Sequence, residues 1–311
     1  MPPSRRQLYT AMFTATFFWG SLPVASKALV GVVGPLQQAL VRGSSAFVVL
    51  TLFCLAIGRT RPFRAALARP LDVVVQGFLA FFASSLAALL TLQFTTASVQ
   101  SVLVATFPLM LAFFELRGGG VTPRGVAGML IALVGIVAVV GGDDPRRILA
   151  GGIDPRGVGL GLLTAFTIAC SQSWARRNAT TGGDPMGTTA MAAAAAMPML
   201  VAVVLLFGDP GEIVRAPPSA RPLLVYIGVF CTAINFGFWY WALKYVSAAR
   251  AAPIQYLTTP LSVVLAWYFL GEPLTVGLAV GTVLVVAGVT MTQAGHGAGR
   301  MARTPAEEAT A

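Results

Sequence analysis

The residue types that carry most enzymatic and metal chemistry are scarce in this chain. It has one histidine, His296, beyond the last apolar segment, and three cysteines inside apolar segments: Cys54, Cys170 and Cys231. The sequence contains no CxxC pair and no P-loop motif. Catalysis needs a base, a nucleophile or a metal cluster. The sequence therefore predicts no enzyme, no metal site and no cofactor, and it predicts buried packing roles for the cysteines.

Two basic residues inside apolar segments are candidates for ligand chemistry. Lys27 lies near the end of the first segment, and Arg42 lies about two turns into the second. Charges in an apolar setting mark function by default, and an arginine fork suits a carboxylate or a phosphate. We expect Arg42 to bind substrate and Lys27 to contribute to the local positive potential. The alternative is that Lys27 snorkels to an interface and Arg42 bonds helix-end carbonyls.

Neutral polar and aromatic residues near the middle of the apolar segments are the predicted cavity lining. Asn235 and Trp239 are four residues apart, as are Gln255 and Thr259, so each pair shares a helix face. An amide beside an aromatic ring suits an amphipathic ligand; the alternative is helix–helix contacts or interfacial belts. Together with Arg42, the predicted substrate-binding residues are Trp19, Ser21, Ser84, Gln172, Trp174, Asn235, Trp239, Gln255, Tyr256 and Thr259.

The composition predicts that membrane-spanning helices position these residues. Of 311 residues, 56% are hydrophobic and 10% are charged, and the mean hydropathy is +0.79. A soluble domain carries about 25% charged residues, and disorder requires low hydrophobicity. The net charge of +10 comes from basic residues in short segments between apolar runs. That placement fits membrane topology and an anionic leaflet rather than nucleic acid.

Ten apolar stretches have the length of about 20 residues that a membrane-spanning helix needs. Basic or turn-rich segments separate most of them. The first stretch is not a signal peptide, because it carries Trp19, Pro23 and Lys27 and leads directly into further stretches. We expect an all-α membrane protein with spans at 8–29, 35–57, 71–92, 97–116, 124–141, 156–176, 187–207, 222–243, 248–269 and 273–293.

The distribution of Lys and Arg predicts the orientation. With the N-terminus inside, thirteen of these residues lie on the cytoplasmic side and five on the opposite side. The positive-inside rule then predicts an inner (plasma) membrane protein with both termini in the cytoplasm. Residues 295–311 are rich in Gly and Ala, and we expect a disordered cytoplasmic tail there.

The two halves of the chain resemble each other at an offset of about 150 residues. Each predicted half, 1–143 and 144–294, contains five spans, and an odd number inverts the second half relative to the first. Inverted halves predict a binding site near the midplane and alternating access by rocking. The matched pairs include Thr14-Ala15 with Thr164-Ala165, Ser21 with Ser171, Thr106 with Thr258, Gly128 with Gly281, and Gly135 with Gly288.

Prolines at matched positions, Pro108 and Pro260, are the predicted gating elements. Each breaks the helical hydrogen-bond ladder, and matched interruptions in two halves point to the binding site. The alternative is a static kink. Gly277 and Gly281 form a GxxxG pair, which serves either a dimer face or packing within one bundle. The oligomeric state stays open, and a monomer is compatible with the sequence.

Short motifs, taken in order, resemble those of the EamA family in the drug/metabolite transporter superfamily. The similarity covers residues 8–293 and implies a ten-helix carrier or exporter of small metabolites, with amino acids a frequent substrate class. The Gly-Glu pair of the family is missing near Gly119-Gly120, which weakens a role for a paired glutamate there. The motifs are Trp19-Gly20-Ser21, Lys27, Arg42, Ala242-Leu243-Lys244-Tyr245, Pro260 and Gly271-Glu272-Pro273.

We therefore predict a secondary transporter that moves small metabolites, amino acids foremost, across the inner membrane by export or facilitated exchange. Asp72, Glu115 and Glu272 lie at predicted span ends. Because ion-driven carriers normally use a buried carboxylate, we expect no ion coupling. The alternative is a lipid or prenyl-carrier flippase, in which Lys27 and Arg42 would bind headgroups. The predicted partners are the solute and the bilayer, not nucleic acid; the lack of catalytic groups disfavours an embedded enzyme, and inverted halves disfavour a channel.

Overall fold

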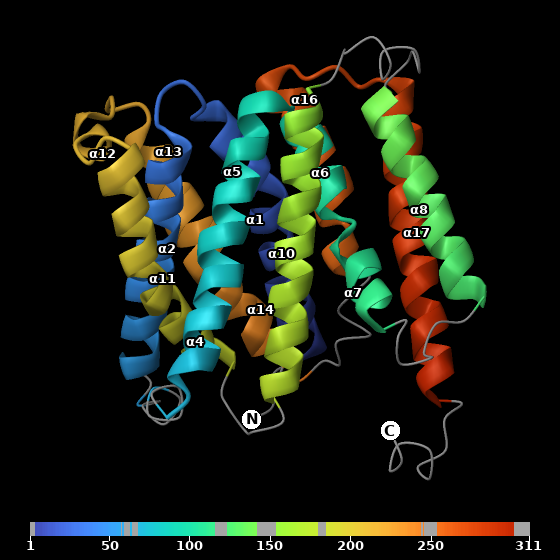
Figure 1. Ribbon diagram of the computed structural model, residues 1–311, viewed down its shortest axis with the longest axis horizontal. Coiled ribbons are helices and arrows are strands. Elements are labelled where there is room, and N and C mark those ends of the chain that lie inside the picture. Colours follow the sequence, from blue (N-terminus) through green and yellow to red (C-terminus); the bar gives the residue numbers. More distant parts are fainter. Residues whose placement is uncertain are drawn as a thin grey trace.

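The computed structural model describes residues 4–56, 58, 63, 68–115, 123–141, 154–179, 185–243, 245 and 254–301. Within these residues the chain is helical and has no strand. The long helices run roughly parallel or antiparallel to one another in a bundle (Figure 1). In chain order they are α1 (Arg5–Ala28), α2 (Pro35–Ala56), α4 (Pro70–Gly77), η1 (Phe78–Ala83), α5 (Ser84–Phe94), α6 (Ala97–Val104), α7 (Phe107–Glu115), α8 (Pro123–Gly141), α10 (Pro155–Ala179), α11 (Pro185–Phe207), α12 (Glu212–Arg215), α13 (Arg221–Val225), η3 (Tyr226–Ile234), α14 (Asn235–Leu243), α16 (Thr258–Leu270) and α17 (Val276–Met301).

Each predicted apolar stretch coincides with a helical stretch in the described part of the chain. Three are shorter apolar helices, at Ala97–Leu111, Ile254–Leu270 and Val276–Thr292. Another is α1, which carries Lys27 and the pair Arg5 and Arg6. The six that are long and apolar enough to cross a bilayer by themselves are Pro35–Ala56, Pro70–Phe94, Pro123–Val140, Pro155–Ala175, Gly187–Phe207 and Arg221–Trp239.

Helices α8 and α17 pack against each other at one side of the bundle (Figure 1). A Cβ atom on Gly128 would lie 2.6 Å from the carbonyl oxygen of Gly288, and one on Gly135 would lie 2.8 Å from that of Gly281. Only glycine lets the two backbones come this close. Such close packing stabilises contacts between helices in a membrane, because the hydrophobic effect does not drive helices together in lipid. Gly281 of the predicted GxxxG pair therefore packs within the bundle.

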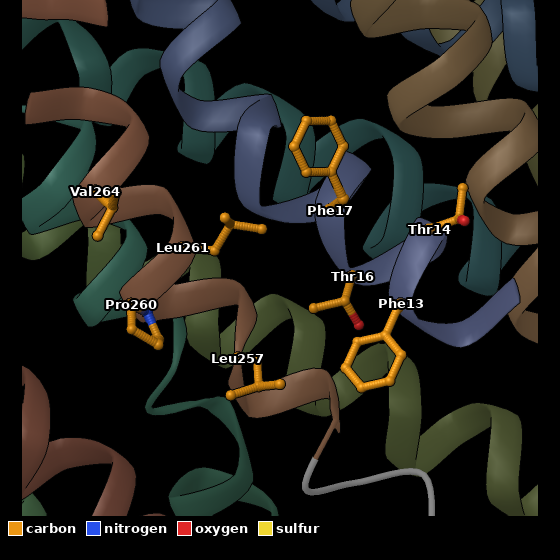
Figure 2. Close-up of a pocket in the computed structure, with 8 residues that line it drawn as sticks. All are labelled: Phe13, Thr14, Thr16, Phe17, Leu257, Pro260, Leu261 and Val264. Carbon is orange, nitrogen blue, oxygen red and sulfur yellow. The ribbon is translucent and has the colours of Figure 1, made fainter. Parts of the chain in front are cut away.

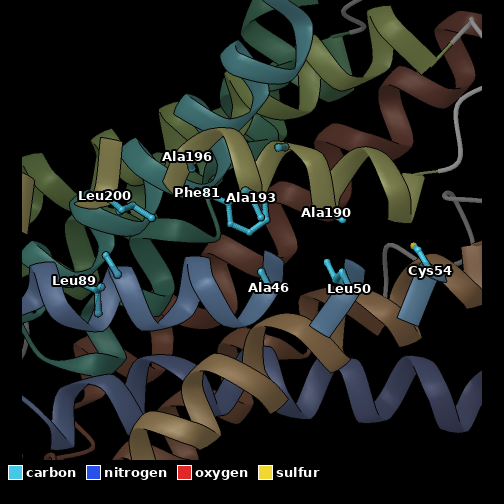
Figure 3. Close-up of a cluster of buried hydrophobic side chains, with 11 residues drawn as sticks. Ala46, Leu50, Cys54, Phe81, Leu89, Ala190, Ala193, Ala196 and Leu200 are labelled. Carbon is cyan, nitrogen blue, oxygen red and sulfur yellow. The ribbon is translucent and has the colours of Figure 1, made fainter. Parts of the chain in front are cut away.

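Helices α2, α4 and α11 pack through small side chains. A Cβ atom on Gly77 of α4 would lie 2.5 Å from the carbonyl oxygen of Ala192 on α11. The alanine run of α11 presents a face without protruding side chains, which lets the neighbouring backbones approach. The buried cluster that results (Figure 3) consists of Ala39, Ala46, Leu50, Cys54, Phe81, Leu89, Ala190, Ala192, Ala193, Ala196 and Leu200.

Two helices are interrupted just before the matched prolines. The break between α6 and α7 lies at residues 105–106, and the break before α16 lies at Leu257. The hydroxyl of Thr106 donates to the Leu103 carbonyl, and that of Thr258 donates to the Gln255 carbonyl, each at 2.7 Å. Pro108 and Pro260 follow within the first turn of the next helix, where a missing N–H costs little. The prolines begin new helices rather than kink continuous ones.

Two π-helical segments occur at equivalent positions, η1 in the first half of the chain and η3 in the second. In a π-helix each backbone N–H donates to the carbonyl five residues earlier, and such segments are frequent at functional sites. The apolar pattern of these stretches did not predict them.

The chain ends differ in part from the sequence-based expectation. Helix α17 continues to Met301, beyond the predicted end of the last span near residue 294, and residues 302–311 lie outside the described part. The predicted boundary between the halves, 143/144, also falls among undescribed residues. The start of α1 and the end of α17 lie at the same end of the bundle (Figure 1).

Candidate functional site

Polar side chains of α1, α2 and η3 meet inside the bundle. The Ser21 hydroxyl lies 2.7 Å from the Tyr226 hydroxyl and 3.7 Å from the Cys231 sulfur. Beside Cys231, the Thr232 hydroxyl donates to the Ile227 carbonyl at 2.7 Å, following the five-residue spacing of the π-helix. Arg42 Nε donates to Thr232 Oγ1 at 3.4 Å. We call Ser21, Arg42, Tyr226, Cys231 and Thr232 the Arg42 cluster.

Among the described residues, no acidic side chain compensates the charge of Arg42 in this cluster. Arg42 lies seven residues into α2, which is roughly 10 Å from the helix start. Within the described residues it forms no ion pair, and its one hydrogen bond, to Thr232, is long. A guanidinium carries five N–H donors, and an unpaired charge at this depth is costly. The arrangement is suited to an anion that completes the coordination.

An amide and a group of rings continue from the Arg42 cluster along α14. Asn235 is fully buried. Its Nδ2 donates to the Cys231 carbonyl at 3.3 Å, and its Oδ1 has no hydrogen-bond partner among the residues that the structure describes. One turn further on, the Trp239 ring lies 5.2 Å from Trp19. Phe236 packs edge-on against Trp19, with ring centroids 5.9 Å apart, and its ring is tilted against that of Phe81 at 6.0 Å. The Arg42 guanidinium, the Asn235 Oδ1 acceptor and the rings of Trp19 and Trp239 therefore lie in sequence along the inside of the bundle.

Lys27 is placed apart from this group. Its Nζ donates to the carbonyl oxygens of Leu92 at 2.6 Å and of Thr95 at 2.8 Å, the free carbonyls at the end of α5. The predicted electrostatic residue therefore holds a helix end. The sequence suggested hydrogen bonding to helix-end carbonyls as an alternative role for Arg42. In the structure Lys27 makes such bonds.

Glu272 binds the other side of this connection, at the start of α6, a role for which the sequence offered only a family-like motif. Its carboxylate accepts hydrogen bonds from the N–H groups of Ala97 and Ser98 at 2.7 and 3.0 Å and from the Ser98 hydroxyl at 2.6 Å. These are the free donors at the start of α6. Lys27 and Glu272 therefore fix the short α5–α6 connection from both sides. The motif Gly271-Glu272-Pro273 was the only signal for this role.

The other predicted substrate-binding residues are dispersed. No hydrogen bond joins them to the Arg42 cluster in the described part of the chain. Ser84 donates to the Ala80 carbonyl of its own helix at 2.5 Å, and Gln172 is exposed. The indole nitrogen of Trp174 is buried without a partner. Gln255 is half-buried and Thr259 is buried.

Tyr256 lies in an apolar cluster that also includes residues of α6, α8, α16 and α17. The neighbours in this cluster include Val102, Val139 and Val285, and no described residue forms a hydrogen bond with the buried Tyr256 hydroxyl. Its surroundings are those of a packing residue.

A hollow of about 670 Å³ lies between α1 and α16. Figure 2 shows side chains of the two helices facing each other across it. Phe13 and Phe17 are about half exposed at its rim, so it is an open apolar groove on the lipid-facing surface rather than the expected central pocket. Of the predicted functional residues only Pro260 lines it. The lining residues are Phe13, Thr14, Thr16, Phe17, Leu257, Pro260, Leu261 and Val264.

Comparison with known proteins identifies relatives over nearly the whole chain. The model of the EamA-like transporter family matches twice, at residues 7–141 and 155–293. An "Uncharacterized transporter" of Archaeoglobus fulgidus is 27% identical over 208 residues, which are 66% of this chain and 70% of the relative. A protein of Streptantibioticus cattleyicolor named "Probable terminal-alkyne amino-acid exporter" is 30% identical over 209 residues, 63% of each chain.

A chloroplastic WAT1-related protein of Arabidopsis thaliana extends the match. It is 25% identical over 301 residues, which are 90% of this chain and 68% of that protein. A solved crystal structure superposes with a TM-score of 0.65 at 21% identity, and the match covers 96% of this chain and 100% of the other. At that identity the superposition shows a shared fold.

Proposed function

This chain belongs to the EamA-like transporter family, and we propose that it is a secondary carrier of small metabolites, amino acids foremost, working by alternating access. Its family and its apolar helices make it a multi-pass membrane protein and a transporter rather than an enzyme. The relative named as an amino-acid exporter favours that substrate class. The alternative of lipid flipping has no support among these relatives.

We further propose ten spans in two inverted halves, with an inner-membrane location and both termini in the cytoplasm. One family model matching both halves supports the repeat. The packing supports it too, because the halves exchange partners: α1 packs on η3, α14 and α16, whereas α10 packs on η1, α5, α6 and α7. Likewise α2 packs on η3, and α11 packs on α4 and η1. An approximate two-fold axis between the halves explains these equivalent pairings.

The observation that carries the substrate proposal is the guanidinium of Arg42, which no acidic side chain compensates within the described residues. Its hydrogen-bond partner Thr232 lies three residues before Asn235, whose buried Oδ1 has no hydrogen-bond partner in that part of the chain. In our proposal the carboxylate of the solute binds Arg42, its amino group donates to Asn235, and its apolar part contacts Trp19 and Trp239. The acidic residue buried in the described part, Glu272, is engaged at a helix end, which favours uncoupled exchange.

Counterflow into proteoliposomes tests this proposal. Arg42→Gln should lower exchange of a labelled apolar amino acid by tenfold or more, since one charged hydrogen-bond interaction contributes about 1.5–3 kcal/mol. Arg42→Lys should retain part of the exchange. The control is Arg215→Gln, which removes an exposed arginine paired with Asp209 and should leave exchange unchanged.

The decisive comparison uses the same solute without its carboxylate. In the wild-type protein this amine should compete weakly, and Arg42→Gln should not weaken it further. If Arg42→Gln lowered binding of the amino acid and of the amine equally, Arg42 would be structural and the proposed anchor would be wrong.

A further inference from the structure

Two hydrogen bonds between helices occupy equivalent positions in the two halves. In one, the Ser21 hydroxyl of α1 lies 2.7 Å from the Tyr226 hydroxyl of η3. In the other, Gln76 Nε2 of α4 donates to the Ser171 hydroxyl of α10 at 2.9 Å. Ser171 is 150 residues after Ser21, and Tyr226 is 150 residues after Gln76. Equivalent positions of the two halves are thus joined twice, once by two hydroxyls and once by an amide and a hydroxyl.

The two contacts lie toward opposite ends of the bundle. The end of α1 and the start of α10 meet at the same place, because Lys27 Nζ binds the Thr95 carbonyl and Gly157 packs on Thr95. Ser21 is less than two helical turns from Lys27. Ser171 is about four turns from Gly157, roughly 21 Å along α10. Each contact therefore joins the halves on its own side of the midplane.

Both contacts adjoin π-helical segments. Gln76 lies two residues before η1, and Tyr226 is the first residue of η3. A π-helical segment marks a local change of helical pitch and is frequent at functional sites. In both halves, the partner of the serine therefore stands where the backbone pitch changes, and a small change of that segment would move it relative to α1 or α10.

We propose that Ser21–Tyr226 and Gln76–Ser171 are the latches of the two gates of alternating access. This rests on the proposed carrier function. Both latches are closed in this structure, which makes it an occluded state, and opening either side breaks one latch while the other holds. Ser21 then acts in gating rather than in the substrate binding that its sequence position predicts.

The two latches differ in how many of their buried polar atoms form hydrogen bonds. The Ser21 hydroxyl also lies 3.1 Å from the Phe18 carbonyl oxygen, whereas Gln76 Oε1 is buried and has no partner in the described part of the chain. A buried acceptor without a partner destabilises the closed state, and it gains water when the gate opens. The Gln76–Ser171 gate is therefore the one that opens more readily at rest.

Cys231 offers a native reporter for the test. It is almost fully buried and lies beside Ser21, so opening of the Ser21–Tyr226 gate should expose it. In a Cys54→Ala/Cys170→Ala background, the rate of Cys231 modification by a water-soluble methanethiosulfonate is measured on the purified protein. Hydrogen bonds between membrane helices average about 0.6 kcal/mol, so each variant should shift the rate about threefold.

The two latches should shift this rate in opposite directions. Tyr226→Phe should raise it, whereas Ser171→Ala and Gln76→Leu, both distant from Cys231, should lower it. Ser44→Ala removes a hydroxyl that bonds only its own helix, at Leu40 and Val41, and should leave the rate unchanged.

An increase or no change with both Ser171→Ala and Gln76→Leu, or no increase with Tyr226→Phe, would overturn the proposal. Simple destabilisation would raise the rate in every variant and is thereby recognised. Because labelling needs no substrate, a wrong substrate class would leave these rates as expected and would show only in the counterflow assay.

Discussion

Replacing Glu272 by Gln tests whether one carboxylate joins two distant parts of this fold. The carboxylate accepts three hydrogen bonds, from Ala97 N–H, Ser98 N–H and the Ser98 hydroxyl, at 2.6–3.0 Å. A glutamine has the same shape but only one side-chain oxygen. That oxygen can accept from one of the two N–H groups, and the glutamine NH₂ then faces the other N–H group. One N–H at the start of α6 is then left without an acceptor.

The magnitude follows from these contacts. Leaving a buried donor unsatisfied costs about 1–3 kcal/mol, and removing a negative charge from a helix N-terminus costs about 0.3–1 kcal/mol. Since Glu272 is only 8% exposed, little solvent compensates. We expect Glu272→Gln to lower the free energy of unfolding by about 3 kcal/mol, measured by circular dichroism in a denaturant titration of the detergent-solubilised protein.

Glu212 supplies the matched control. Its carboxylate accepts one backbone bond, from Gly34 N–H at 2.6 Å, and the residue is half-buried. A glutamine keeps that single acceptor, so Glu212→Gln should cost less than about 1 kcal/mol. If Glu272→Gln were no more destabilising than Glu212→Gln, the reasoning that Glu272 fixes the start of α6 would be refuted.

Two further substitutions test the packing. Gly281→Ala should destabilise the protein by about 1–3 kcal/mol, because the new Cβ would lie 2.6 Å from the Gly135 carbonyl oxygen; Gly159→Ala, with open space around it, should be neutral or slightly stabilising, and equal thermal shifts for the two would contradict the close α8–α17 contact. Tyr256→Phe should leave the thermal midpoint unchanged or raise it, because it removes a buried hydroxyl that has no partner. A fall in that midpoint would mean that the hydroxyl has a partner in the folded protein.

Local patterns in the sequence were sufficient to place the helices. Apolar runs bounded by Pro, Gly and Arg predicted 35–57 and 187–207, and the structure has Pro35–Ala56 and Pro185–Phe207. The repeat also predicted which glycines are equivalent. Gly128 matches Gly281, and Gly135 matches Gly288. In the structure Gly128 packs against Gly288 and Gly281 packs against Gly135, so equivalent glycines make equivalent contacts, as an antiparallel crossing requires.

The features of the site that could not be predicted depend on contacts between residues that are distant in the sequence. Glu272 and Ala97 are 175 residues apart, and Lys27 and Leu92 are 65 apart, so no local pattern indicates either cap. The Tyr226 and Gln76 side chains are chemically unlike, and only the fold reveals that they occupy equivalent positions. Tyr256 shows a different difficulty: its hydroxyl suggested a ligand contact, and the structure surrounds the side chain with apolar neighbours, so its binding role stays a prediction.

The departure from symmetry at position 42 bears on the proposed binding role of Arg42. The residue equivalent to Arg42 in the second half is Ala192, fully buried in the alanine face of α11. A Cβ on Gly77 would lie 2.5 Å from the Ala192 carbonyl oxygen, so α4 and α11 leave no room for a long side chain there. The second half therefore lacks the charge at this position and also packs too tightly there to hold a side chain like that of Arg42. In the carrier that we propose, there is thus one charged half-site, which the solute must reach from either side; we therefore assign the charge of Arg42 to binding and the symmetric contacts to gating.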